Sequence, residues 1–107
     1  MTDLLQNGTE ALTADDLDNL PRLFATDDEA LEDHMLWVKF FDPMGSWTWY
    51  AAEWGSEDRL FFGYVEGFEG EWGYFSLDEL LSIGGPSRLG IERDLYFMPC
   101  RFSELGR

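Results

Sequence analysis

The chain has 107 residues, and its 22 Asp and Glu residues against 7 Lys and Arg residues give a formal net charge of −15. Hydrophobic residues make up 45% and aromatic residues 17%, which argues against a disordered acidic chain and predicts one folded domain over residues 1–107. The charge argues against direct binding to nucleic acid or to an anionic membrane, because phosphates would be repelled. The expected partner is therefore a basic protein.

Residues that carry chemistry are scarce. Cys100 is the single cysteine and His34 the single histidine, so neither an internal disulfide nor a structural zinc site, which needs about four Cys or His ligands, is expected. We interpret Cys100 as a small packed residue and His34 as a surface residue, rather than as a nucleophilic pair. No catalytic or nucleotide-binding motif occurs, so the sequence predicts no enzyme, no catalytic residues, no metal and no cofactor.

Targeting signals and membrane spans are also not expected. The first residues do not form an apolar run with a basic flank, and the longest apolar stretches fall far short of the ~20 residues of a membrane span. We therefore expect a cytoplasmic protein.

The first third of the chain predicts little regular structure. Residues 1–10 have few apolar side chains and are expected to be flexible. Thr13 is expected to cap a short helix, with Asp16 three positions further on and Pro21 marking the end of the helix. Residues 26–33 are expected to form an acidic connection or a weak helix.

From Met35 onwards the pattern changes to strands separated by turn residues. Apolar residues at both odd and even positions of 47–54 predict a strand that is covered on both faces. Ser76 is expected to cap a short helix that stops at 84–86. The fold class is therefore α+β, with a single antiparallel sheet of about four to five strands and short helices packed against it. The predicted strands are 35–42, 46–54, 59–65, 71–75 and 94–98.

Five ordered motifs resemble those of a known family. The sequence resembles a small domain of unknown function found in proteobacteria and in their plasmids, integrative elements and phages, and the resemblance covers about residues 12–99. It brings no catalytic residue or cofactor, but it implies a single domain and an accessory or defence-related role on a mobile element. The motifs are W-V-K-F-F-D-P (37–43), W-T-W-Y-A-A-E (47–53), F-F-G-Y-V-E-G (61–67), G-Y-F-S-L-D-E-L (73–80) and I-E-R-D-L-Y-F-M-P (91–99).

The acids are concentrated near the N-terminus, with a net charge of −9 over residues 1–33 and of −6 over residues 34–107. Carboxylates at spacings close to those of duplex phosphates can occupy a DNA-binding cleft and compete with DNA for its Lys and Arg. We therefore expect a non-enzymatic accessory protein that binds a basic, nucleic-acid-binding host complex as a DNA-mimicking inhibitor of the anti-restriction or anti-CRISPR type. The residues expected to form its binding surface are Asp15, Asp16, Asp18, Asp27, Asp28, Glu29, Glu32, Asp33, Glu66, Glu69 and Glu71.

Other interpretations stay open. The charge can serve solubility or a salty cytoplasm alone, since Lys39 is the single lysine. The protein is then an adaptor or regulator, monomeric or homodimeric, that binds through an aromatic patch. Most aromatic residues are expected in the core, and Trp54 and Trp72 are expected to be partly exposed.

Carboxylate pairs also point to hydrolysis, but only weakly. Glu53 with Glu66, or Glu92 with Asp94, resembles the pairs that glycosidases use, although so acidic a chain brings some carboxylates together by chance. A structural role is favoured for the last of these segments, with Arg93 pairing with an acid.

Overall fold

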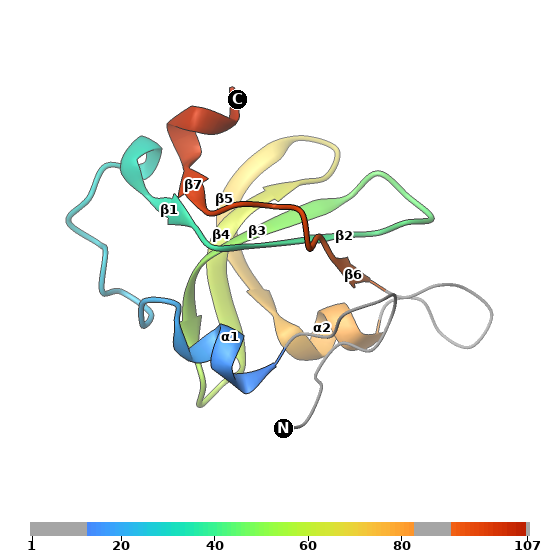
Figure 1. Ribbon diagram of the computed structural model, residues 1–107, viewed down its shortest axis with the longest axis horizontal. Coiled ribbons are helices and arrows are strands. Elements are labelled where there is room, and N and C mark those ends of the chain that lie inside the picture. The colour runs from blue at the N-terminus through green and yellow to red at the C-terminus, as the bar shows by residue number, and fades with distance from the viewer. Residues whose placement is uncertain (1–12, 83–90, 107) are drawn as a thin grey trace.

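The computed structural model of the chain describes residues 13–82 and 91–106 (Figure 1). The expected flexibility of residues 1–10 and the expected helix stop at 84–86 lie outside these residues. In chain order the elements are α1 (Ala14–Asp18), the 3₁₀ helix η1 (Leu31–Asp33), β1 (Met35–Leu36), β2 (Val38–Phe41), β3 (Thr48–Gly55), β4 (Leu60–Glu66), β5 (Gly70–Ser76), α2 (Leu77–Ser82), β6 (Glu92–Arg93), β7 (Cys100–Arg101) and the 3₁₀ helix η2 (Phe102–Leu105).

The strands form two antiparallel sheets. Five strands pair in the order β5-β4-β3-β2-β6, and β1 pairs with β7 in a separate two-stranded sheet. The described chain is therefore mostly sheet with short helices, and the expectation of a single sheet is wrong. The reason is that the strand predicted over 35–42 divides at Trp37: Met35 and Leu36 pair with β7, whereas Val38 to Phe41 pair with β3.

The prediction of a strand over 94–98 is also wrong. This segment is a loop between β6 and β7. The carboxylate of Asp94 accepts the backbone N–H of Tyr96 at 2.9 Å, and its carbonyl oxygen accepts the N–H of Phe97 at 3.3 Å. A short acidic side chain that bonds to the backbone in this way favours a turn over a strand.

Helix α1 begins as predicted. The side-chain oxygen of Thr13 accepts the N–H of Asp16 at 3.3 Å, and the Asp16 carboxylate accepts the N–H of Thr13 at 3.0 Å, which completes a capping box. The helix ends at Asp18. The carbonyl oxygen of Pro21 then accepts the N–H of Trp54 at 2.9 Å, so the chain after α1 joins the end of β3.

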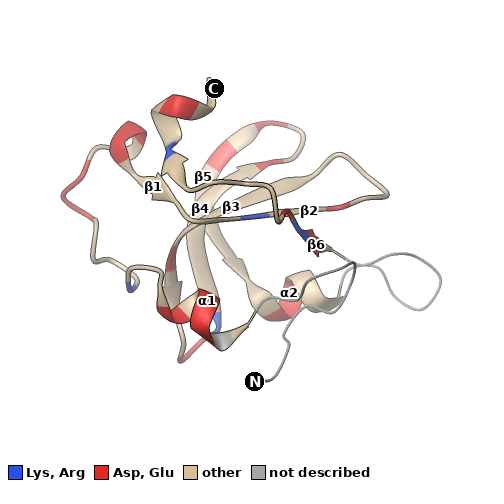
Figure 2. Cartoon of the chain, in the orientation of Figure 1, with Lys and Arg blue, Asp and Glu red and all other residues tan. Residues whose placement is uncertain are grey.

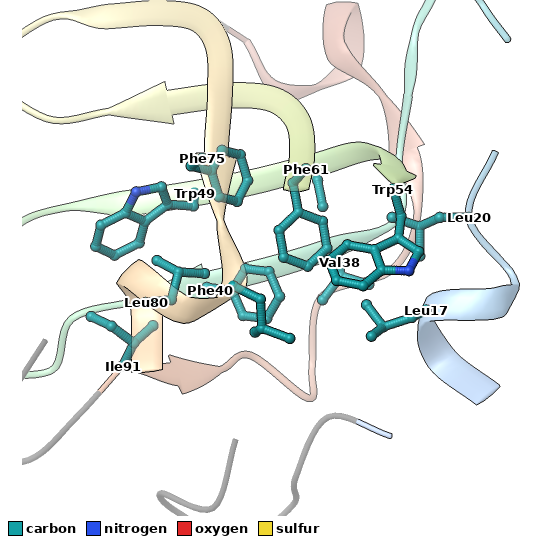
Figure 3. Close-up of a cluster of buried hydrophobic side chains, with 12 residues drawn as sticks. Leu17, Leu20, Val38, Phe40, Trp49, Trp54, Phe61, Phe75, Leu80 and Ile91 are labelled. Carbon is teal, nitrogen blue, oxygen red and sulfur yellow. The ribbon is translucent and has the colours of Figure 1, made fainter. Parts of the chain in front are cut away.

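The larger hydrophobic cluster lies on the face of the five-stranded sheet that α1 and α2 cover (Figures 1 and 3). Phe40 and Phe61 lie at its centre and are fully buried, while Trp49 and Trp54 lie at its two ends. Burial of one such phenylalanine contributes roughly 1.5–3 kcal/mol. The members are Leu17, Leu20, Val38, Phe40, Trp49, Ala51, Trp54, Phe61, Phe75, Leu77, Leu80 and Ile91.

A second cluster covers the opposite face of the sheet. Leu36, Tyr50 and Ala52 form its centre, and Phe102 and Leu105 from η2 pack against them. Because successive side chains of a strand point to opposite faces, Tyr50 and Ala52 lie in this cluster while Ala51 lies in the other. Strand β3 is thus buried on both faces, as its apolar residues at odd and even positions predicted.

Candidate functional site

Five of the predicted acids lie together in the acidic segment, which we define as residues 27–33. Turns form its first part, with the N–H of Glu29 bonded to the carbonyl oxygen of Thr26 at 3.0 Å, and η1 forms the rest. All five side chains are exposed, and no ion pair joins them to a basic residue in the described ranges 13–82 and 91–106. The five acids are Asp27, Asp28, Glu29, Glu32 and Asp33.

The acids of α1 divide into two groups. Asp15 and Asp18 are exposed. Asp16 is half-buried and its carboxylate is engaged within the protein, because its Oδ2 accepts the N–H of Thr13 at 3.0 Å and a guanidinium N–H of Arg93 at 2.7 Å. Arg93 therefore pairs with an acid, as its segment suggested, and the pair joins α1 to β6.

The acids predicted in the β4–β5 hairpin are placed unequally. Glu69 and Glu71 are exposed, whereas Glu66 is half-buried. Figure 2 shows acidic residues on α1, on α2, on the loop before β1 and on this hairpin, so in this view they surround the molecule. The predicted acids thus lie on several surfaces, of which the acidic segment is the most continuous in sequence.

The two aromatic residues that were expected to be partly exposed differ from each other. Trp54 is buried at 8% exposure, which corrects the expectation for it, because its ring packs 4.6 Å from that of Phe61 in the larger hydrophobic cluster. Trp72 is half-buried, with its ring 5.1 Å from that of Phe102.

His34 is a core residue, so the expectation that it lies on the surface is wrong. It is 3% exposed, its Nδ1 lies 3.0 Å from the carbonyl oxygen of Ala30, and its ring meets that of Trp72 edge-on at 5.5 Å. The sequence did not reveal this because the aromatic partner comes from a distant strand.

Cys100 lies half-buried in β7. Burial raises the pKa of the Cys100 thiol, and the nearby Glu104 carboxylate raises it further. The thiol is therefore held in its protonated form, which is the opposite of an activated nucleophile.

Glu53, which the sequence offered only weakly as a member of a hydrolytic pair, is a structural residue. The residue is 2% exposed, and its carboxylate accepts the N–H of Phe24 at 2.8 Å, the N–H of Thr26 at 3.1 Å and the hydroxyl of Thr26. It lies at a β-bulge in β3, where the register against β4 shifts. The sequence did contain a sign of this role: Glu53 lies within a strand that was predicted to be buried on both faces, and a buried carboxylate requires hydrogen-bond donors.

A cleft of about 510 Å³ lies between β5, α2 and the end of the β2–β3 hairpin. We call it the β5 cleft. Trp47 lines it and is 37% exposed, with its ring 6.1 Å from that of Trp49 and 5.7 Å from that of Phe68. Residues that line it include Trp47, Trp49, Glu71, Gly73, Glu79 and Leu80.

No group of three or more His, Cys, Asp or Glu side chains able to hold a metal ion occurs in the part of the chain that the structure describes. Within those same residues, no helix is long and apolar enough to cross a membrane.

The model of the family described as "protein of unknown function (DUF2958)" matches residues 2–104. The chain belongs to this family. The resemblance to a family of unknown function is thereby confirmed. Comparison with curated proteins finds no match, and neither does comparison with solved structures. The family description states no activity.

Proposed function

We propose that this DUF2958 protein is a non-enzymatic accessory protein that binds a basic, nucleic-acid-binding partner through its exposed acids. The observation that carries the proposal is the acidic segment, whose five exposed carboxylates have no ion-pair partner among the described bases. Carboxylates that form no ion pair within the protein can attract the Lys and Arg of a partner and speed association.

The narrower form of the proposal is a DNA mimic. Duplex DNA is recognised largely through its phosphates, so a protein that offers carboxylates to the same cleft competes with DNA and loses affinity as salt rises. The net charge of −15 supports this form, as does the mobile-element setting that the sequence resemblance implies. It is an inhibitor of the anti-restriction or anti-CRISPR type, acting in the cytoplasm where those complexes work.

The test is a titration against restriction and CRISPR surveillance complexes, at several salt concentrations and with duplex DNA as competitor. Affinity should fall with salt and with added DNA. The variant Asp27→Lys/Asp28→Lys should abolish binding, whereas the matched control Glu57→Lys/Asp58→Lys, which makes the same charge change in the exposed β3–β4 turn, should retain most of it. Binding that ignores both salt and DNA contradicts the proposal.

A second candidate function is supported by exposed apolar side chains at two neighbouring hairpin ends. Met44 is 56% exposed, Phe68 is 95% exposed, and the ring of Phe68 contacts that of Trp47. Exposed apolar residues that cluster in this way are typical of protein-binding surfaces. In this alternative the protein is an adaptor, its charge serves solubility, and Phe68→Ser abolishes partner binding while the Asp27→Lys/Asp28→Lys variant retains it.

A further inference from the structure

Strand β5 forms one edge of the five-stranded sheet. It is seven residues long, whereas β6 at the opposite edge has two. Within residues 13–82 and 91–106, no strand pairs with its outer side. The outward N–H and C=O groups of an edge strand are a template for another extended chain, so the backbone of β5 offers a site for a strand from a partner.

The β5 cleft lies directly beside this edge. Its lining includes the partly exposed Trp47 and the exposed acids Glu71 and Glu79. Among the described residues, no Lys, Arg or His lines it. An aromatic face together with carboxylates attracts a cation, so the chemistry of the cleft complements a positively charged side chain.

Two glycines give the cleft its shape. A Cβ atom on Gly67 would overlap the ring of Trp47, so the missing side chain lets the indole, which lines the cleft, lie against the β4–β5 turn. A Cβ atom on Gly73 would meet no heavy atom within 4 Å. By contrast, a Cβ atom on Gly63, which pairs with Gly73 in register, would overlap the carbonyl oxygen of Tyr50. The open space therefore lies at Gly73, inside the cleft.

We propose that the β5 cleft binds a Lys or Arg side chain of a partner protein, presented by an extended segment that pairs with the outer edge of β5. The backbone of the segment supplies affinity by strand addition, and the cleft selects the cationic side chain. The inference goes beyond the proposed function, because it uses no residue of the acidic segment and assigns the partner a defined local conformation.

Seven-residue peptides that match the length of β5 provide the probes. Blocked peptides of alternating Thr and Val, with Arg, Lys, norleucine or Glu at the centre, are titrated into the ¹⁵N-labelled full chain. We expect shifts in the β5 amides and the Trp47 indole N–H, and about tenfold weaker binding when norleucine replaces Arg. N-methylation of alternate peptide amides should also weaken binding. Equal binding of the norleucine and Arg peptides, or shifts elsewhere on the protein, overturns the proposal.

Protein variants separate this site from the acidic segment. Gly73→Leu fills the cleft from a strand position with free space and should reduce Arg-peptide binding more than about tenfold. Glu71→Gln keeps the shape of the cleft and should weaken the Arg peptide but not the norleucine peptide, whereas the control Glu57→Gln should change neither. Unchanged Arg-peptide binding in Gly73→Leu overturns the proposal, and Glu71→Gln decides the matter if that variant does not fold.

The two proposals fail in different ways. Asp27→Lys/Asp28→Lys should abolish binding to a DNA-binding complex and leave peptide binding at the β5 cleft largely intact. If the acidic segment alone carries the interaction with the DNA-binding complex, Gly73→Leu should weaken peptide binding and leave binding to that complex intact. Loss of peptide binding in the Asp27→Lys/Asp28→Lys variant contradicts a separate cleft.

Discussion

The buried carboxylate of Glu53 joins β3 to the chain that precedes the acidic segment. Its oxygens accept two backbone N–H groups and one hydroxyl, all from the chain just before the acidic segment. Donors that lose a charged acceptor inside a protein are left with a desolvation penalty that little else offsets. The carboxylate therefore stabilises the start of the acidic segment rather than any substrate.

Glu53→Gln tests this role. The amide keeps the size of the side chain but turns an N–H₂ group towards donors, so we expect the free energy of unfolding to fall by roughly 1–3 kcal/mol. Urea denaturation measures the change, and amide hydrogen exchange should accelerate at Phe24 and Thr26. Equal stability of the variant and the parent would show that other contacts hold this loop.

Cys100 gives a prediction on pH dependence. Because burial, and then Glu104, raises the pKa of the thiol, its thiolate should form at higher pH than that of a short cysteine peptide. The rate of alkylation by iodoacetamide should therefore rise to half its maximum at a higher pH in the folded protein. Glu104→Gln removes the smaller cause and should lower this midpoint part of the way. A midpoint at or below that of the peptide contradicts the environment described for β7.

At the scale of elements, α1 depends on one shared carboxylate. Asp16 completes the capping box with Thr13 and pairs with Arg93, with side chains 27% and 23% exposed respectively. Without such support five residues are too few to form a stable helix. The helix thus depends on a tertiary contact to β6 as much as on its own sequence.

Two variants separate these contributions. Thr13→Ala removes the cap and should cost about 1 kcal/mol of unfolding free energy. Asp16→Asn weakens both the cap and the ion pair and should cost more than Thr13→Ala. A double-mutant cycle with Arg93→Met, followed by urea denaturation, isolates the pair, which at this exposure is expected to be worth up to about 1 kcal/mol. Additive effects of Asp16→Asn and Arg93→Met would exclude coupling between them.

The elements that the sequence predicted well are those whose cause is local. Strands β3, β4 and β5 lie within about two residues of the predicted 46–54, 59–65 and 71–75, because alternating apolar residues and flanking turn residues determine them. The break at Trp37 was not predictable, because it arises from pairing with β7 more than sixty positions further on. The segment 94–98 has the apolar composition of a strand, and the turn formed by Asp94 distinguishes it.

The candidate sites follow the same division. Exposure of the acidic segment was predictable, since residues 27–33 have almost no apolar side chains to bury. The burial of Glu53 and His34 was not, because their partners come from remote segments. The β5 cleft is also a tertiary feature: Trp47, Gly73 and α2 come together only when the sheet has formed.

At the scale of the whole molecule, the 22 acids that give the net charge of −15 are only partly paired with bases. Three of the acids pair with described bases, namely Asp94 with Lys39, Asp78 with Arg59 and Asp16 with Arg93, and these pairs are partly or largely exposed. The remaining carboxylates repel one another over distances that salt screens. Repulsion among these carboxylates should therefore lower the stability of the folded state by a measurable amount.

The melting temperature should accordingly rise with ionic strength. We expect an increase of several degrees between very low salt and about 0.15 M NaCl, where the Debye length has shortened to about 8 Å. Differential scanning calorimetry of the full chain measures it. The variant Asp27→Asn/Asp28→Asn, which removes two negative charges, should show a smaller increase. A melting temperature that does not change with salt would mean that the carboxylates lie too far apart to interact.

The acidic segment is attached to the sheet on both sides. Glu53 binds the chain at Phe24 and Thr26 before it, and after it the His34 carbonyl oxygen accepts the N–H of Phe102 at 2.9 Å while the His34 ring is buried. The segment has therefore given up much of its conformational entropy during folding, and a partner need not supply that cost again on binding. Substitutions at Glu53 or His34, which are buried, should then weaken binding as substitutions of the exposed carboxylates do.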